Sequence, residues 1–171
     1  MARVVQCPTE FAEASLNVKY TEHAATVDVT QHEKSLFVAG GISGCEQWQK
    51  QFISFLKPVS NLVLLNPRRE TYDLKNLEMS HEQIEWEHRH LEAADGISFW
   101  FPYETLCPIT LYELGYWMNS NKQIFIGTHP LYARRFDVVK QTSLSRPNIV
   151  VVHSLKELVL QVAAWVNGVD L

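Results

Sequence analysis

The segment "SLFVAGGISGCEQWQ", residues Ser35 to Gln49, decides the fold class of this sequence. Four apolar residues, 36–39, run directly into two glycines and then into a stretch with a helical pattern. An uninterrupted apolar run is typical of a strand buried on both faces, as in a parallel sheet covered by helices. The glycines predict a tight turn from strand to helix, and in α/β proteins such a turn often lies beside a ligand.

Strand and helix patterns alternate from this segment to the end of the sequence. Strands are expected at 36–39, 61–67, 96–101, 123–128 and 148–152, and helices at 45–57, 80–95, 109–120, 133–143 and 154–168. Ser154 with Glu157, and Ser80 with Gln83, fit capping boxes at two of the helix starts. The sequence therefore predicts an α/β fold, with a doubly wound parallel sheet of about five strands in a flavodoxin-like or Rossmann-like three-layer domain.

This domain is expected to span residues 35–171, with residues 1–34 as an N-terminal extension or edge element. Within the extension, "RVVQCP" (3–8) has the composition of a short strand, whereas the residues after it are polar and poorly periodic. A length of 171 residues is enough to bury the core of one ordinary domain.

The composition argues against several classes of protein. The formal net charge is −4, without the Lys- and Arg-rich character of proteins that bind polymeric nucleic acid. Cys7, Cys45 and Cys107 lie far apart, which argues against a disulfide framework and favours a reducing compartment. The N-terminal residues lack the pattern of a secretory signal, and no apolar run approaches the length of a membrane span. We therefore expect a soluble, cytoplasmic protein that binds neither membranes nor nucleic acid.

The residues after the predicted strands are candidates for a binding site, because ligands in such folds lie beyond the carboxyl ends of the strands. The turn formed by Gly40, Gly41, Ile42 and Ser43 matches neither a dinucleotide-binding motif nor a phosphate-binding loop. Either its backbone, with the N–H groups of the following helix start, holds ligand oxygens, or it is a tight turn without a ligand.

Two arginines follow the second predicted strand. Arg68 and Arg69 are placed to grip a phosphate or a carboxylate at the edge of the sheet. The alternative is a solvated loop in which they pair with Glu70 and Asp73.

Glu87 falls on the apolar stripe of the predicted helix 80–95, together with Ile84, Leu91 and Ala94. A carboxylate in such a place is costly unless it is paired or neutral, and perturbed carboxylates concentrate at functional sites. The alternatives are that it extends outward from the helix margin or bonds to a buried tryptophan N–H.

Glu113 follows Pro108 and is expected in the first turn of the next helix. The helix dipole there would favour an ionised carboxylate, which is what a carboxylate nucleophile requires. The alternative is a structural capping box with Thr110.

Other reactive residues give no pattern of their own. The histidines lack any metal-binding spacing, so we expect no metal and no cofactor. Cys107 has no base nearby in the sequence and is interpreted as a small buried or edge thiol.

Four segments together resemble the nucleoside 2-deoxyribosyltransferase family, most closely its bacterial deoxyribosyltransferase-like branch. They are "SLFVAGGISG", "LLNPRR", "WEHRHLEAADGISFWF" and "PITLYELGYW", and the similarity extends over about residues 35–152. The family also includes the 2′-deoxynucleoside 5′-monophosphate N-glycosidases. The resemblance implies N-glycosidic bond transfer or hydrolysis on a small-molecule deoxynucleoside or deoxynucleotide.

The resemblance also implies roles for three acidic residues. Glu113 matches the nucleophile, which attacks C1′ of the deoxyribose and forms a deoxyribosyl-enzyme ester, and Glu87 matches the general acid. Asp95, which opens a predicted strand, completes the set with a mainly structural role. The intervals of 8 and 18 residues between them are those of the family. Members of the family are homo-oligomers, so a homo-oligomer is expected here, with Tyr116 and Trp117 as candidate pairing residues.

Three positions depart from the pattern of the family. Phe37 stands where the family has a tyrosine that touches the nucleophile. Cys107 stands where transferases carry Asp and nucleotide hydrolases a phosphate-binding Ser, and Ser43 replaces an Arg of the hydrolases. The choice between transferase and hydrolase therefore stays open. The candidate substrate-binding residues are Phe37, Gly40, Gly41, Ile42, Ser43, Asn66, Arg68, Arg69, Trp100 and Cys107.

Two other functions remain as alternatives. A phosphoribohydrolase of the lysine decarboxylase-like group also uses a Glu early in a helix, but after a Gly-Gly-x-Gly-Thr loop that "CPITLYE" lacks. A catalytically silent nucleotide-binding or sensing module is favoured by Phe37 and Cys107, since fold alone does not fix function.

Overall fold

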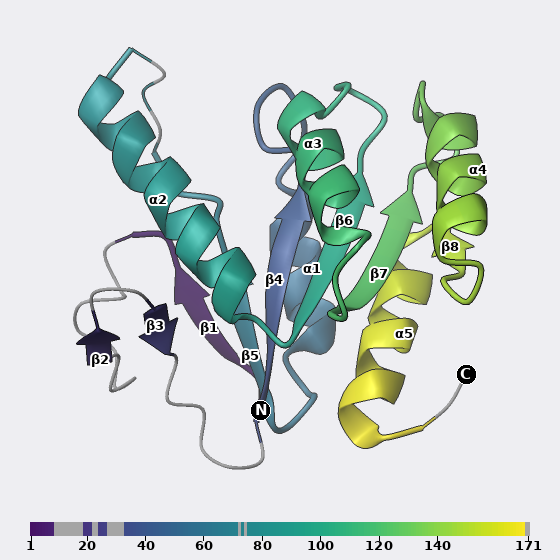
Figure 1. The fold of residues 1–171 in the computed structure, drawn as a ribbon, viewed down its shortest axis with the longest axis horizontal. Helices are drawn as coiled ribbons and strands as arrows, with labels where there is room; N and C mark the ends of the chain where they lie inside the picture. The colour runs from purple at the N-terminus through teal and green to yellow at the C-terminus, as the bar shows by residue number, and fades with distance from the viewer. Residues whose placement is uncertain (9–18, 22–23, 27–32, 72, 74, 170–171) are drawn as a thin grey trace.

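A six-stranded parallel sheet forms the centre of the fold (Figure 1), with the strand order β1-β5-β4-β6-β7-β8. The computed structural model describes residues 1–8, 19–21, 24–26, 33–71, 73 and 75–169. The strands of the sheet are β1 (Arg3–Gln6), β4 (Lys34–Gly40), β5 (Leu62–Asn66), β6 (Gly96–Phe101), β7 (Gln123–Thr128) and β8 (Val151–Val152). A separate antiparallel pair is formed by β2 (Lys19–Thr21) and β3 (Ala24–Thr26).

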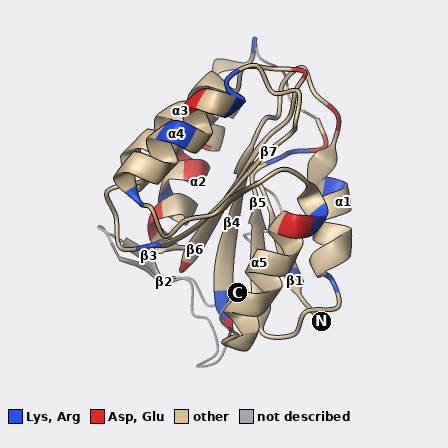
Figure 2. Cartoon of the chain, turned by 90° about the vertical axis from the view of Figure 1, so that its right-hand side faces the viewer, with Lys and Arg blue, Asp and Glu red and all other residues tan. Residues whose placement is uncertain are grey.

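Helices cover both faces of the sheet, as the continuous apolar strands require. They are α1 (Trp48–Leu56), α2 (Leu77–Ala93), α3 (Pro108–Trp117), α4 (Arg135–Ser145) and α5 (Leu155–Asn167). Side chains of α2, α3 and α4 pack into one core, and those of α1 and α5 pack into the core on the opposite face. Figure 2 shows these two helical layers on either side of the sheet. The predicted three-layer α/β architecture is therefore confirmed.

The connections place a switch point at the centre of the sheet. The chain passes from β4 to β5 on one side, and then through α2 to β6 on the other side of β4. The order β5-β4-β6-β7-β8 is that of a flavodoxin-like sheet, and β1 extends it beyond β5. The sheet therefore has six strands, one more than the alternating pattern predicted. In folds of this type ligands bind at the carboxyl ends of the strands beside such a switch point.

The helix caps agree with the sequence in one case and differ in the other. Ser154 accepts a hydrogen bond from the Glu157 N–H, as predicted, and Gly168 ends α5 in the left-handed conformation. The capping box predicted at Ser80 is wrong, because α2 begins earlier and Asn76 caps it by accepting from Met79 N–H. Asn is as good an N-cap as Ser, so the helix extends to the earlier cap.

The turn after β4 is glycine-rich because other groups approach its backbone closely. A Cβ on Gly40 would lie 2.3 Å from the Trp48 ring and 2.5 Å from the Trp100 carbonyl oxygen. A Cβ on Gly41 would lie 2.7 Å from Pro102 and 2.9 Å from the Cys107 sulfur. These distances leave no room for a side chain, so packing behind the turn fixes its course.

The charged residues and the cysteines show no grouping on the described part of the chain. Acidic and basic residues are interspersed on the helices visible in Figure 2. Cys7, Cys45 and Cys107 are free thiols. None of the helices in the described parts of the chain combines the length and apolar character needed to cross a membrane.

Candidate active site

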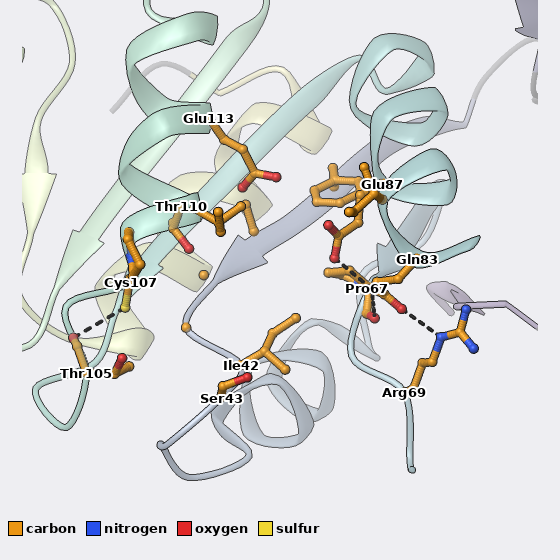
Figure 3. Close-up of a pocket in the computed structure, with 17 residues that line it drawn as sticks. Ile42, Ser43, Pro67, Arg69, Gln83, Glu87, Thr105, Cys107, Thr110 and Glu113 are labelled. Carbon is orange, nitrogen blue, oxygen red and sulfur yellow. Dashed lines mark hydrogen bonds between the residues drawn. The ribbon is translucent and has the colours of Figure 1, made fainter. Parts of the chain in front are cut away.

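A pocket of about 380 Å³ opens beyond the carboxyl end of β4, at the switch point of the sheet. Its walls come from α2 and α3, and the turn after β4 forms its floor. Figure 3 shows Glu113 entering from α3 and Glu87 from α2, on opposite sides, with Ile42 and Ser43 below. A pocket of this size and place is typical of a small-molecule site.

Glu113 reaches the pocket from the second turn of α3, not from the first. The helix begins at Pro108, after Cys107 adopts a left-handed conformation with φ of 49°. With about 3.6 residues per turn, the sixth helical residue lies beyond the first turn. The predicted support from the helix dipole is therefore wrong, and so is the Thr110 capping box, since Thr110 lies buried inside the helix and lines the pocket.

Glu87 lies half-buried on the pocket side of α2, held by one neighbour on its own helix. Gln83 Nε2 donates a hydrogen bond of 2.6 Å to Glu87 Oε1. The predicted stripe is partly wrong: Ile84 is 62% exposed, and Gln83 and Trp86 occupy the buried face instead. Ile84 lines the open pocket, so its side chain is not covered by the core.

The two carboxyl groups have different electrostatic surroundings. Burial, together with the charge of Glu87, raises the pKa of Glu113 to about 8. Among the described residues, none donates a hydrogen bond to Glu113. Burial also raises the pKa of Glu87, but the hydrogen bond from Gln83 and the charge of Arg69 oppose that rise. Of the two carboxyls, Glu113 is therefore the better place for a proton, and Glu87 is the better place for a negative charge.

The turn after β4 lines the pocket as predicted, but the start of the next helix does not. Gly40, Gly41, Ile42 and Ser43 all face the pocket. Trp48 Nε1 donates to the Gly41 carbonyl oxygen at 2.7 Å from behind the turn. Because α1 begins only at Trp48, the expectation that its N–H groups hold ligand oxygens in this pocket is wrong.

Phe37, Arg69 and Cys107 also lie at the pocket. Phe37 is buried and presents a ring without a hydroxyl. Burial raises the pKa of the Cys107 thiol to about 12, so this thiol stays protonated and is not a nucleophile.

Arg69 belongs to the wall rather than to a solvated loop. Its Nε donates to Gln83 Oε1 and its Nη2 pairs with Glu82 Oε2, each at 2.7 Å. The predicted pairing with Glu70 and Asp73 is therefore wrong.

The structure does not bring four of the predicted site residues to this pocket. Asp95 lies at the amino end of the strands, where its Oδ2 accepts from the Ser35 N–H and Ser35 hydroxyl at 2.7 Å. Arg68 donates to the carbonyl oxygens of Cys45 and Glu46 and so fixes the loop before α1. Asn66, whose Oδ1 accepts from the Arg68 N–H, lies beside it in a separate surface groove.

Trp100 is the fourth of these residues. It is 5% exposed and packs against Trp48 in the core on the α1 side of the sheet, so it offers no face to a base. Alternation along β6 points its side chain away from the α2 face, a signal that was present in the sequence.

Several lining residues were missed by the sequence analysis. They are Pro67, Gln83, Ile84, Thr105, Pro108, Ile109 and Thr110. Gln83 had a usable signal, since it lies four residues before Glu87 and therefore on the same face of the helix. Within the residues that the structure describes, no group of three or more His, Cys, Asp or Glu side chains is arranged to hold a metal ion.

Comparison with known proteins adds one finding. The family model described as "Nucleoside 2-deoxyribosyltransferase like" matches residues 33–131, which include both pocket carboxyls. A search of curated proteins gave no match.

Proposed function

Because the chain belongs to the nucleoside 2-deoxyribosyltransferase-like family, we propose that it breaks the N-glycosidic bond of a 2-deoxynucleoside and transfers the deoxyribosyl group. The observation that carries this proposal is the pair of carboxyls, Glu87 and Glu113, entering one pocket from opposite walls. Paired carboxyls that face each other across a pocket suit glycosyl chemistry, in which one group attacks the sugar or activates its acceptor and the other handles the proton of the leaving group.

The proposed reaction needs one proton on the pair. An oxygen of ionised Glu113 attacks C1′ while the C1′–N bond breaks, and Glu87 gives its proton to the departing base. This step forms a deoxyribosyl ester of Glu113 with inverted configuration at C1′. A second base or water then attacks C1′, and Glu87 takes up the proton of that acceptor. The ester bond breaks, the configuration is restored, and the pair again holds one proton.

The charges that line the pocket favour a nucleoside over its monophosphate. Arg69 is the only cation among the described lining residues, and its donors are directed at Gln83 and Glu82. A phosphate would instead meet the acidic pair, Glu87 and Glu113, without a free positive charge to balance it. We therefore expect the unphosphorylated deoxynucleoside as the substrate.

A chromatographic turnover assay tests the proposal. The chain would be incubated with each deoxynucleoside and each 5′-monophosphate, with and without a different free base. A new nucleoside that forms only with the acceptor base identifies a transferase, and free base without exchange identifies a hydrolase. Tight binding of nucleosides without any turnover would contradict the proposal and support the catalytically silent binding module.

We also propose that the chain forms a homo-oligomer through the outer face of α3. Ile109, Tyr112 and Tyr116 on this helix are 65%, 74% and 59% exposed. Trp117, the other predicted pairing residue, is buried at 6% and belongs to the core. Exposed apolar groups clustered beside a pocket favour an interface between copies. Light scattering of the wild type and of Tyr112→Lys would test it, with a loss of mass expected for the variant.

A further inference from the structure

Gln83 is the centre of a closed hydrogen-bond network in the wall of the pocket. Its Oε1 accepts from Arg69 Nε at 2.7 Å and from the Cys7 thiol at 3.1 Å. Its Nε2 donates to the Pro67 carbonyl oxygen at 2.7 Å and to Glu87 at 2.6 Å. Two acceptor positions and two donor positions are thus all used, which is the full capacity of an amide.

This network allows the amide only one orientation. A guanidinium cannot accept a hydrogen bond and a carbonyl oxygen cannot donate one. If the amide were flipped, its NH₂ would face Arg69 and its oxygen would face the Pro67 carbonyl, and both contacts would be lost. Gln83 is also buried, at 8% exposure, so water cannot readily replace the lost partners. The N–H directed at Glu87 is therefore fixed by the wall itself.

We propose that Gln83 is a positioning residue that keeps Glu87 ionised in the ligand-free protein and so leaves the proton of the pair on Glu113. A directed N–H stabilises the charged form of a carboxylate, and Glu87 has such a donor. Glu113 has none among the described residues, and the negative charge across the pocket favours its neutral form. The importance of this arrangement for catalysis rests on the proposed function, but the position of the proton does not.

The charged and titratable groups around the pair support this assignment. The charge of Arg69, from the loop after β5, opposes the rise that burial causes in the pKa of Glu87. Glu113 faces Glu87 from α3. Burial raises the pKa of the Cys7 thiol to about 11, so Cys7 remains a donor to Gln83. Glu82, on α2, accepts a hydrogen bond from Arg69 Nη2. None of these groups supplies a donor to Glu113.

In the proposed reaction the proton must then move before the chemistry. It leaves the Glu113 carboxyl and is taken up by the Glu87 carboxylate, so one transfer creates both the nucleophile and the acid. The number of protons on the pair does not change. Substrate binding would favour this transfer if an acceptor atom of the base approaches Glu87 and demands a proton there.

Carbon-13 NMR titration of the glutamate carboxyls in the ligand-free chain tests the position of the proton without using activity. Glu87→Gln and Glu113→Gln assign the two signals. In the wild type we expect the higher pKa to belong to Glu113. In Gln83→Met we expect the pKa of Glu87 to rise by about one unit and that of Glu113 to fall, because a neutral Glu87 no longer repels its charge.

Gln161→Met is the matched control, since it removes another side-chain amide away from the pocket. Gln161 lies on α5, and its Nε2 donates to the Val150 carbonyl oxygen. This variant should leave both carboxyl titrations unchanged. If Gln83→Met does not fold, Arg69→Met provides the same test, with a smaller expected rise for Glu87 because Gln83 keeps its bond to Pro67.

Two results would overturn the inference. One is a Glu87 titration that stays at the wild-type value in Gln83→Met, and the other is a higher pKa that disappears in Glu87→Gln instead of Glu113→Gln. Failure of the proposed function looks different: the wild type would show the expected titrations but release no base from any nucleoside. In that case the proton would still be assigned to Glu113.

Discussion

Asp95 and Glu113 are acidic residues at opposite ends of the same sheet, and their surroundings differ sharply. Asp95 accepts two hydrogen bonds from Ser35, and its own N–H donates to the Ser35 hydroxyl at 3.0 Å. Glu113 is half-buried in a pocket and receives no hydrogen bond from the described residues. Both were assigned to one catalytic set by resemblance to the same family. The hydrogen bonds of Asp95 indicate a role in holding two strands together, whereas the lack of such bonds at Glu113 fits the nucleophile role that we propose for it.

The largest effect that separates the two residues is expected in turnover. Glu113→Gln removes the proposed nucleophile and should reduce kcat by at least about 1000-fold. Asp95→Ala should leave kcat per folded molecule close to the wild-type value, because Asp95 lies at the other end of the strands. Base release measured by chromatography on folded fractions of both variants decides this. Equal losses in the two variants would remove the functional distinction between them.

A second effect is expected in the pH dependence of kcat/KM. The reaction needs one proton on the Glu87 and Glu113 pair, and the pKa of Glu113 is about 8. Above that pH the pair loses its last proton, so kcat/KM should fall about tenfold per pH unit on the alkaline side. On the acid side it should fall as Glu87 also becomes protonated. A rate that keeps rising beyond pH 8 would mean that no general acid is required.

Stability should give the reverse ranking of the two residues. Asp95→Ala leaves the buried Ser35 N–H and hydroxyl without their acceptor. The loss of such an acceptor costs about 1–3 kcal/mol in the free energy of unfolding. Urea denaturation would measure it, with Ser35→Ala in the Asp95→Ala background showing how much of the cost belongs to this pair. An unchanged midpoint would mean that water replaces the carboxylate.

An effect of similar size but opposite sign is expected for Glu113→Gln, as a gain in stability at alkaline pH. The pKa of Glu113 is raised from an ordinary 4.5 to about 8, so the folded chain holds a proton that the unfolded chain has lost. The stability from this proton is complete below pH 4.5 and is lost as the pH rises towards 8. Near pH 8 the Glu113→Gln variant should be more stable than the wild type by about 1–3 kcal/mol. The reason is that the glutamine needs no proton to be buried without a charge. Thermal unfolding of the wild type and of Glu113→Gln at several pH values between 4.5 and 8 measures the difference. A difference in Tm that stays the same at every pH would contradict the prediction.

The sequence predicted the layers of the fold well because its signals were periodic and local. Mainly apolar runs such as 96–101 and 123–128 correspond directly to β6 and β7. Helix starts were less certain, since a capping pattern at Ser80 could not be distinguished from the real cap at Asn76 without knowing which contacts the helix makes. Short strands at the edge, such as β1, carry too few residues to predict a partner.

The site was predicted in part for a related reason. Glu87 was singled out because it falls on a predicted apolar stripe, and Glu113 because it follows Pro108 near the start of a helix. The resemblance to the family then joined the two in one site. Which of the neighbouring arginines faces the pocket depends on packing: Arg69 enters the wall, whereas Arg68 turns back to the loop before α1. Consecutive residues at a strand end point in different directions, and the sequence does not say which direction leads to the pocket.

The tight packing behind Gly40 has a consequence for how new specificities could evolve on this scaffold. Any side chain at Gly40 would collide with the Trp48 ring and the Trp100 carbonyl oxygen, so this part of the pocket floor is closed to mutation. Ile84 and Ile109 line the walls but are 62% and 65% exposed, and replacing them would leave both cores intact. Selection for a different nucleobase would therefore be expected to accumulate changes in the walls, while Gly40 is inherited without change.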